Sequence, residues 1–244
     1  MSTPADRAAR QNQQILAKIP GARSAWRLLG ALRVAWRDGS RKSQAELEHT
    51  YKLPVAFDYV TSEPEKLRHG LELAMIDRVA TNGRFRRVLE IGCAEGVFTE
   101  HLSSRCDTLL SVDFLNASLS RARQHVGPKA NVEFGLLDIR VDPLPGDLDL
   151  ICACHVLDYV RNPIALRKIR ERIVSAMRPG GYLLVGFWTT DPNEGYWWSP
   201  FFLRGGKQIG EFFADHPKLT VVDSSVASHS STYENSDLLL RKVD

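Results

Sequence analysis

The sequence has little cysteine and no long apolar run. Its four cysteines, Cys93, Cys106, Cys152 and Cys154, form no C-x-x-C pair and no Cys/His cluster at zinc spacing, so neither a disulfide framework nor a metal site is expected. A reducing, cytoplasmic location is favoured. The chain lacks both the apolar stretch of a membrane span and the apolar segment of a secretory signal, which predicts a soluble, unprocessed protein.

A strong charge bias is also missing. The formal net charge is +3, and 43% of the residues are hydrophobic and 25% charged, as in an ordinary globular protein. A charge this small does not by itself indicate a nucleic-acid partner. The length of 244 residues allows one large α/β domain, or one domain with a substantial appendage.

Residues 1–50 differ from the rest of the chain. Up to Lys42 there are nine Lys and Arg residues but only two acids, and apolar residues recur at roughly helical spacing on both sides of Pro20 and Gly21. We expect a basic, amphipathic helical extension here, followed by the main domain at 51–244. Its apolar face could pack on the main domain, cap a pocket as a lid, or contact a membrane surface peripherally.

Strand-like and helix-like segments alternate after this extension. The expected strands cover 86–92, 108–113, 131–138, 147–154 and 181–188, and the expected helices cover 65–81, 96–106, 116–126 and 162–177. Asn116 is a plausible helix N-cap, and Pro163 suits a first helical turn. This alternation predicts a parallel, doubly wound sheet, with 218–230 and 233–243 as an antiparallel hairpin at its edge.

The turn after the first strand has the pattern E-x-G-x-A-x-G, with Glu90, Gly92, Ala94 and Gly96. It is neither a dinucleotide fingerprint nor a phosphate-binding P-loop. Gly92 permits a tight turn, Gly96 lets the next helix start close to the strand, and Ala94 leaves the backbone accessible. A carboxylate from Glu90 at the lip would repel a pyrophosphate but could receive a ligand amine. The turn therefore favours a cationic nucleoside.

Two further acids follow the next strands. Asp113 ends the second strand at a position expected to be exposed, where a carboxylate can accept both hydroxyls of a ribose. Asp138 follows the third strand, within reach of an adenine amino group. Each of the three acids could instead merely cap the following helix. Their joint spacing favours a ligand site.

These residues resemble the class I S-adenosylmethionine (SAM)-dependent methyltransferase family, through "EIGCAEG", "SVD", "LLDI" and "MRPGGYLLVGF", over about residues 57–244. The resemblance implies an α/β, Rossmann-like, seven-stranded doubly wound sheet with an antiparallel last strand. It implies SAM as cofactor and S-adenosylhomocysteine (SAH) as product. The cofactor-binding residues that it implies are Glu90, Gly92, Cys93, Ala94, Gly96, Asp113, Phe114, Asp138, Ile139 and His155.

A narrower likeness is carried by "PVAFDYVTSEPEKLRHG", "LEIGCAEGVFTEHL" and "DLDLICACHVLDYV". These segments are similar to the nodulation protein S-like methyltransferases, which include an N-methyltransferase of deacetylated chitooligosaccharides. The likeness suggests that Tyr59 and Arg68 lie near the cofactor. The alternative for Arg68 is a position on the surface of a helix.

The loop "CHVLDYV" after the fourth strand lies where a methyl acceptor should approach. His155 is the first candidate for a general base or an acceptor-orienting residue, because an imidazole titrates at about 6.5. A histidine that only stacks on the cofactor or bonds a backbone carbonyl would suit the same position. Asp158 could orient a cationic amine, and Tyr159 is a further candidate. Cys152 and Cys154 are expected to be core residues.

An aromatic segment follows the fifth strand. Trp188, Tyr196, Trp197, Trp198 and Phe201 are candidates for binding an acceptor, because aromatic faces suit sugar rings and flat groups. Packing under the amino-terminal helices is the alternative.

The leading hypothesis is a SAM-dependent methyltransferase acting on N or O of a small molecule, such as an amino sugar or natural-product intermediate, as a monomer or homodimer. An RNA methyltransferase is an alternative, although no RNA-binding module is present. A non-catalytic SAM-binding or membrane-associated accessory protein is another.

Overall fold

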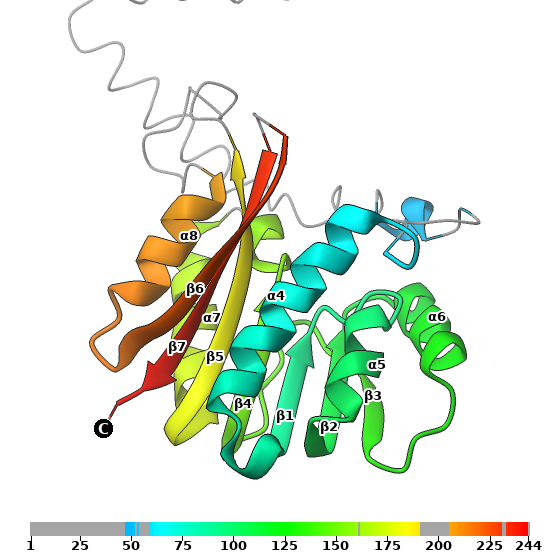
Figure 1. Cartoon of the computed structure of the whole chain (residues 1–244), viewed down its shortest axis with the longest axis horizontal. Coiled ribbons are helices and arrows are strands. Elements are labelled where there is room, and N and C mark those ends of the chain that lie inside the picture. The colour runs from blue at the N-terminus through cyan, green and yellow to red at the C-terminus, as the bar shows by residue number, and fades with distance from the viewer. Residues whose placement is uncertain are drawn as a thin grey trace, which may run out of the picture.

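The computed structural model describes residues 47–51, 53, 59–160, 162–190, 205–230 and 233–243. In this part of the chain seven strands form one sheet, in the order β3-β2-β1-β4-β5-β7-β6 (Figure 1). The strands are β1 (Phe85–Ile91), β2 (Cys106–Asp113), β3 (Val132–Leu136), β4 (Leu148–Cys154), β5 (Met177–Thr190), β6 (Leu219–Ser230) and β7 (Tyr233–Lys242). The helices are α4 (Glu63–Val79), α5 (Val97–Ser103), α6 (Asn116–Val126), α7 (Pro163–Ala176) and α8 (Gly205–Ala214), with single 3-10 turns η1 (Thr81–Gly83) and η2 (Leu157–Tyr159).

The first five strands are parallel, whereas β7 is antiparallel to both β5 and β6. The predicted doubly wound sheet and its antiparallel end are therefore confirmed. Chain order reverses between β1 and β4, which makes their carboxyl ends the switch point where ligands bind in such sheets.

Side chains alternate between the two faces of the sheet and build a core on each. Leu89, Ile151 and Val185 pack with α7 and α8. Their neighbours Val88 and Leu184 belong to the cluster that contains α4 and α5. Figure 1 shows α4 across the near face of the sheet and α7 behind it. The central strands are therefore apolar on both faces, because helices cover both faces of the parallel sheet.

Two local predictions differ in outcome. Pro163 does begin α7, and Asn162 caps that helix by accepting hydrogen bonds from Ile164 N and Ala165 N. The prediction of Asn116 as an N-cap is wrong, because α6 starts at Asn116 and the capping position belongs to Leu115, without a side-chain cap. The amide of Leu115 donates instead to the carboxylate of Asp113.

Some predictions fall outside the described residues. These are the amphipathic helices of the amino-terminal extension and the aromatic residues Tyr196, Trp197, Trp198 and Phe201. Helix α8, after the aromatic segment, was not predicted at all. No helix in the described ranges is long and apolar enough to cross a membrane.

Candidate active site

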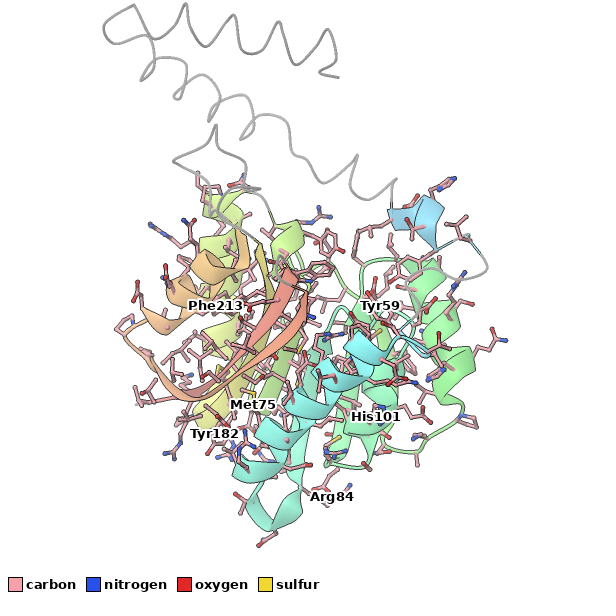
Figure 2. The ribbon with its side chains drawn as sticks, turned by 45° about the horizontal axis from the view of Figure 1, so that its top comes forward. Tyr59, Met75, Arg84, His101, Tyr182 and Phe213 are labelled. Atoms are coloured by element: carbon pink, nitrogen blue, oxygen red, sulfur yellow. The ribbon has the colours of Figure 1, made fainter. Side chains whose placement is uncertain are left out.

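A cavity, called here the central cavity, lies at the carboxyl ends of β1, β2 and β4. Ten of the predicted site residues line it: Tyr59, Arg68, Glu90, Gly92, Cys93, Ala94, Asp113, Phe114, His155 and Tyr159. Figure 2 shows Tyr59 beside the amino end of α4, whereas Arg84 lies at the opposite end of that helix. Residues from four separate segments thus meet at the switch point of the sheet.

The turn after β1 contains three left-handed residues, of which Gly92 and Ala94 are the first two. Gly92 has φ +78°, and a Cβ built there would lie 2.8 Å from Cγ2 of Val156. Its amide donates to the carbonyl of Val112. Ala94 has φ +50°, a conformation that costs an L-residue free energy. Glycine at 92 is therefore required both by conformation and by space, whereas alanine at 94 is tolerated under strain.

Gly96 differs in role from the prediction. It caps α5 with φ +82°, and a Cβ there would lie 3.0 Å from the Cα of Ala122 and from a methyl of Val126. Gly96 therefore allows α5 to approach α6, whereas the prediction was that it allows the helix to start close to the strand. It does not belong to the described lining of the cavity.

Glu90 lies at the floor of the cavity and not at its lip. Its side chain is only 4% exposed. Thr99 Oγ1 donates to its Oε2 at 2.5 Å, and Ser111 Oγ donates to the same oxygen at 2.7 Å. Burial raises the pKa of Glu90 to about 7, although these two hydrogen bonds lower it. The site therefore holds a carboxyl group that a cationic ligand would help to ionise.

Asp113 anchors two loops at once. Its Oδ2 accepts from the amide of Ala94 at 3.1 Å, and its Oδ1 accepts from the amide of Leu115 at 2.9 Å. The residue is 6% exposed, so the expected exposed strand end is wrong. Burial raises the pKa of Asp113, and the backbone hydrogen bonds oppose this. The carboxylate is held rigidly at the cavity wall.

A second cavity adjoins the first and shares Gly92, Asp113 and Phe114 with it. Asp138 and Ile139 line this second cavity, as does Arg140. Arg140 Nε donates to Asp138 Oδ1 at 2.8 Å. Burial alone would raise the pKa of Asp138, but the hydrogen bonds and charge of Arg140 lower it. Asp138 thus stays ionised beside Arg140, whose guanidinium lies over the ring of Phe114.

Arg68 is buried, so the alternative of a surface helix position is wrong. Its Nη1 donates to Glu72 Oε1 at 2.7 Å, and its Nη2 donates to Glu65 Oε2 at 2.5 Å. Burial opposes the charge of Arg68, but Glu72 and Glu65 hold its pKa above the ordinary value. His69, beside it, is buried and its pKa falls to about 3, so that ring is neutral.

His155 and Tyr159 line the central cavity, but Asp158 does not belong to its described lining. His155 has φ +53°, and its amide donates to the carbonyl of Gly186 at 2.9 Å. The ring meets that of Trp188 edge-on, with centroids 5.8 Å apart. Burial raises the pKa of Asp158 to about 7, and the backbone of Trp188 donates a hydrogen bond to its carboxylate. His155 thus holds a strained backbone conformation at the wall of the cavity.

Cys152 and Cys154 lie on β4 with free thiols. Burial raises the pKa of both well above the ordinary value, so neither is a thiolate at neutral pH.

Four residues that shape the cavity were missed. Thr99 and Ser111 hold Glu90, and their only sequence signal was their position beside the acidic motif. Tyr51 lines the cavity, and Arg121 donates to its carbonyl at 2.8 Å and to Glu95 Oε1 at 2.5 Å. These contacts join α6 to a segment about 70 positions earlier in the chain, which no local pattern reveals.

The strand order, with acids at three successive strand ends, is that of the class I SAM-dependent methyltransferase fold. The chain belongs to the nodulation protein S family, whose model matches residues 43–193.

Nodulation protein S of Sinorhizobium fredii is 29% identical over 133 residues, which cover 54% of this chain and 59% of the relative. The chain thus matches less than two thirds of that relative's length. A ubiquinone biosynthesis O-methyltransferase of Acinetobacter baylyi is 25% identical, with 51% of this chain and 52% of that protein covered. The crystal structure of N-methyltransferase NodS from Bradyrhizobium japonicum in complex with SAH superposes with a TM-score of 0.71, at 23% identity, and covers 82% of this chain and 98% of that one.

Proposed function

We propose that this protein transfers the methyl group of SAM to an amine nitrogen of a small-molecule acceptor and releases SAH. The observation that carries the proposal is that His155, a titratable ring, lies on the wall of the same cavity as Glu90 and Asp113. The related structure named as an N-methyltransferase supports nitrogen as the acceptor atom.

The cavity fits the cofactor in its donor set. Asp113 uses each carboxylate oxygen for one backbone amide, which leaves lone pairs for the ribose hydroxyls. Thr99 and Ser111 both bond to Oε2 of Glu90, so Oε1 is the oxygen that would accept from the methionine ammonium. Gly92 and Ala94 allow the close approach of the methionine portion.

The second cavity suits the adenine. Phe114 and Ile139 offer apolar contacts, and Asp138 offers an acceptor for the amino group. Tyr59 and Arg68 line the central cavity, where Arg68 would face the methionine carboxylate. Cys93 and Gly96 shape the turn that carries these contacts.

When bound, SAM supplies an electrophilic methyl group on a sulfonium. The residues of this chain must then hold the acceptor in line, exclude water and receive one proton. His155 is positioned to take that proton as the nitrogen forms its new bond to carbon. Tyr159, on the same wall, orients the acceptor. Asp158 supports the loop through the backbone of Trp188.

The acceptor would lie between His155 and an aromatic wall. Trp188 already contacts the His155 ring, and its side chain is 37% exposed. Tyr196, Trp197, Trp198 and Phe201 follow it in the chain and are proposed as further acceptor-binding residues. Such a wall suits an amino sugar or another flat or ring-shaped amine.

The protein is proposed to act in the cytoplasm, because all four cysteines are free thiols. We further propose a monomer or homodimer that meets membranes only peripherally, through the basic residues 1–50.

The test is carbon NMR of reactions with ¹³C-methyl SAM and separate pools of amines, phenols and carboxylic acids. A new N-methyl signal that wild type produces and His155→Asn does not is the expected result. An O-methyl signal instead would contradict the amine and would favour the chemistry named for the ubiquinone relative.

A further inference from the structure

A buried acidic pair lies behind His155, away from the cavity. Glu72 on α4 and Asp237 on β7 are both 0% exposed. One side-chain oxygen of Glu72, one of Asp237 and one ring nitrogen of His155 lie within 4.8 Å of one another. Neither acid is among the described residues that line the central cavity. Any effect of these acids on the reaction must therefore pass through a neighbour that lines the cavity, which is His155 or Arg68.

When both acids are ionised, the pair carries more negative charge than its neighbours neutralise. Arg68 is the cation beside it, and its guanidinium is shared between Glu72 and Glu65. Apart from the contact of the two acids with each other and that of Glu72 with the Cys154 thiol, Glu72 Oε2 and Asp237 Oδ1 accept no hydrogen bond from the described residues. A positive charge on the adjoining imidazole would supply what the cluster lacks.

Asp237 is held so that one oxygen faces the imidazole. It pairs with Gly186 of β5 on one side and with Ser225 of β6 on the other. Ser225 Oγ donates to Oδ2 at 2.8 Å, while Oδ1 lies 4.0 Å from His155 Nε2.

Gly186 keeps this arrangement open. A Cβ built on Gly186 would lie 2.8 Å from Asp237 Oδ1 and 3.1 Å from the His155 ring. Its φ is not left-handed, so space and not backbone conformation requires glycine at this position.

We propose that Asp237 is a positioning residue for His155, which orients the ring and balances the charge that the ring gains when it accepts the acceptor's proton. The proposal rests on the function proposed above. In the step itself, the acceptor nitrogen forms a bond to the methyl carbon, the carbon–sulfur bond breaks, and the nitrogen's proton passes to His155. In the ionised form, Asp237 remains a carboxylate throughout the step, and the imidazolium forms beside it, with His155 Nε2 4.0 Å from Oδ1.

The charge of Asp237 depends on pH. Burial and the nearby Glu72 raise its pKa to about 8, while Ser225 and Arg68 lower it. The other groups that face it are the Cys154 thiol and His155 itself. Asp237 is therefore partly ionised at neutral pH and fully ionised only at alkaline pH, and the turnover rate should rise as that proton leaves.

The test compares Asp237→Asn with Asp223→Asn. The control makes the same change on the neighbouring strand β6, where Asp223 pairs with the exposed Arg78. We expect Asp237→Asn to lower kcat at alkaline pH by about tenfold to a hundredfold and to abolish its rise between neutral and alkaline pH, while the SAM Kd stays within about twofold. The control should match wild type.

Gly186→Ala provides a second variant, because it keeps both Asp237 and His155 but places a methyl group that should push them apart. It should lower kcat while the alkaline rise in rate persists.

A measurement without acceptor separates this proposal from the proposed function. In ¹⁵N-labelled protein, the His155 ring resonances are assigned by their absence from His155→Asn. We expect their titration to move to lower pH in Asp237→Asn, because a nearby carboxylate stabilises the imidazolium.

An unchanged titration would overturn the proposal even if no acceptor is ever methylated. So would wild-type kcat in Asp237→Asn, or a joint loss of SAM binding and thermal stability, which would indicate structural support alone. If a chelator abolished activity and Mn²⁺ restored it, the proposal would be overturned in favour of a metal site formed by Glu72, His155 and Asp237.

Discussion

The hydroxyl of Thr99 donates a hydrogen bond of 2.5 Å to the buried carboxylate of Glu90. The distance lies in the range of charge-assisted hydrogen bonds, and helix α5 supplies the donor. The hydrogen bonds of Thr99 and Ser111 thus hold a carboxyl group at the buried floor of the central cavity. The ionised form of this carboxyl group is unfavourable there without a ligand.

Glu90→Gln should therefore stabilise the unliganded protein and weaken its binding of SAM. The pKa of Glu90 rises from an ordinary value of 4.5 to about 7 on folding, so the folded state holds its proton more tightly. The resulting cost to stability is absent below the lower value and complete above the higher one, where it is on the order of 3 kcal/mol. Thermal denaturation at mildly acidic and mildly alkaline pH measures this difference.

Calorimetry should show the SAM Kd of Glu90→Gln rising by about tenfold to a hundredfold, since a hydrogen bond to a charged group is lost. Glu133→Gln, on the surface of β3, is the matched control and should change neither quantity. Equal SAM affinity in wild type and Glu90→Gln would remove Glu90 from the cofactor site.

Asp113→Ala and Asp113→Asn should both weaken SAM binding by at least about tenfold, because the ribose acceptor is lost or halved. The two variants should differ in stability. Alanine leaves the amides of Ala94 and Leu115 without their acceptor, which costs about 1 to 3 kcal/mol, whereas asparagine keeps one acceptor oxygen. Asp107→Asn, exposed on the same strand, is the control in calorimetry and urea denaturation.

Ala94→Gly should stabilise the protein by up to about 1 kcal/mol, because a left-handed alanine is strained. Gly92→Ala should destabilise it by about 1 to 3 kcal/mol, because the new methyl meets both a φ of +78° and the side chain of Val156. Urea denaturation compares the two. The opposite order would show that the turn after β1 adopts a different conformation.

Arg121→Ala should speed the release of SAM by about threefold to tenfold. Arg121 donates to the carbonyls of Tyr51 and Leu53 and so holds this segment against the cavity. Stopped-flow release measures the effect. Arg123→Ala is the control on the same helix, because Arg123 contacts Phe134 away from the cavity. Equal release rates for the two variants would mean that the segment does not retain the cofactor.

The sequence was sufficient for the seven strands, for helices α4 to α7 and for the motif residues, but not for α8. Periodicity located α6 to the residue, and the acids at 90, 113 and 138 all meet the two cavities as expected. Strand ends in a parallel sheet converge at one edge, so residues read one by one along the chain could be placed together.

The depth and partners of those residues could not be read in the same way. Glu90 was expected at the lip and lies buried, and Asp113 was expected to be exposed but holds two loops. Burial depends on which helices cover a strand end, and this information is spread over the whole chain.

By itself the sequence determined the α/β sheet, its antiparallel end and the row of acids, because alternation and turn chemistry are local properties of neighbouring residues. Only the tertiary structure brought Glu72, His155 and Asp237 together from α4, the end of β4 and β7. Their separation along the chain leaves no periodic signal. Their proximity arises from packing α4 over β7, which buries them where an unbalanced charge has the greatest effect.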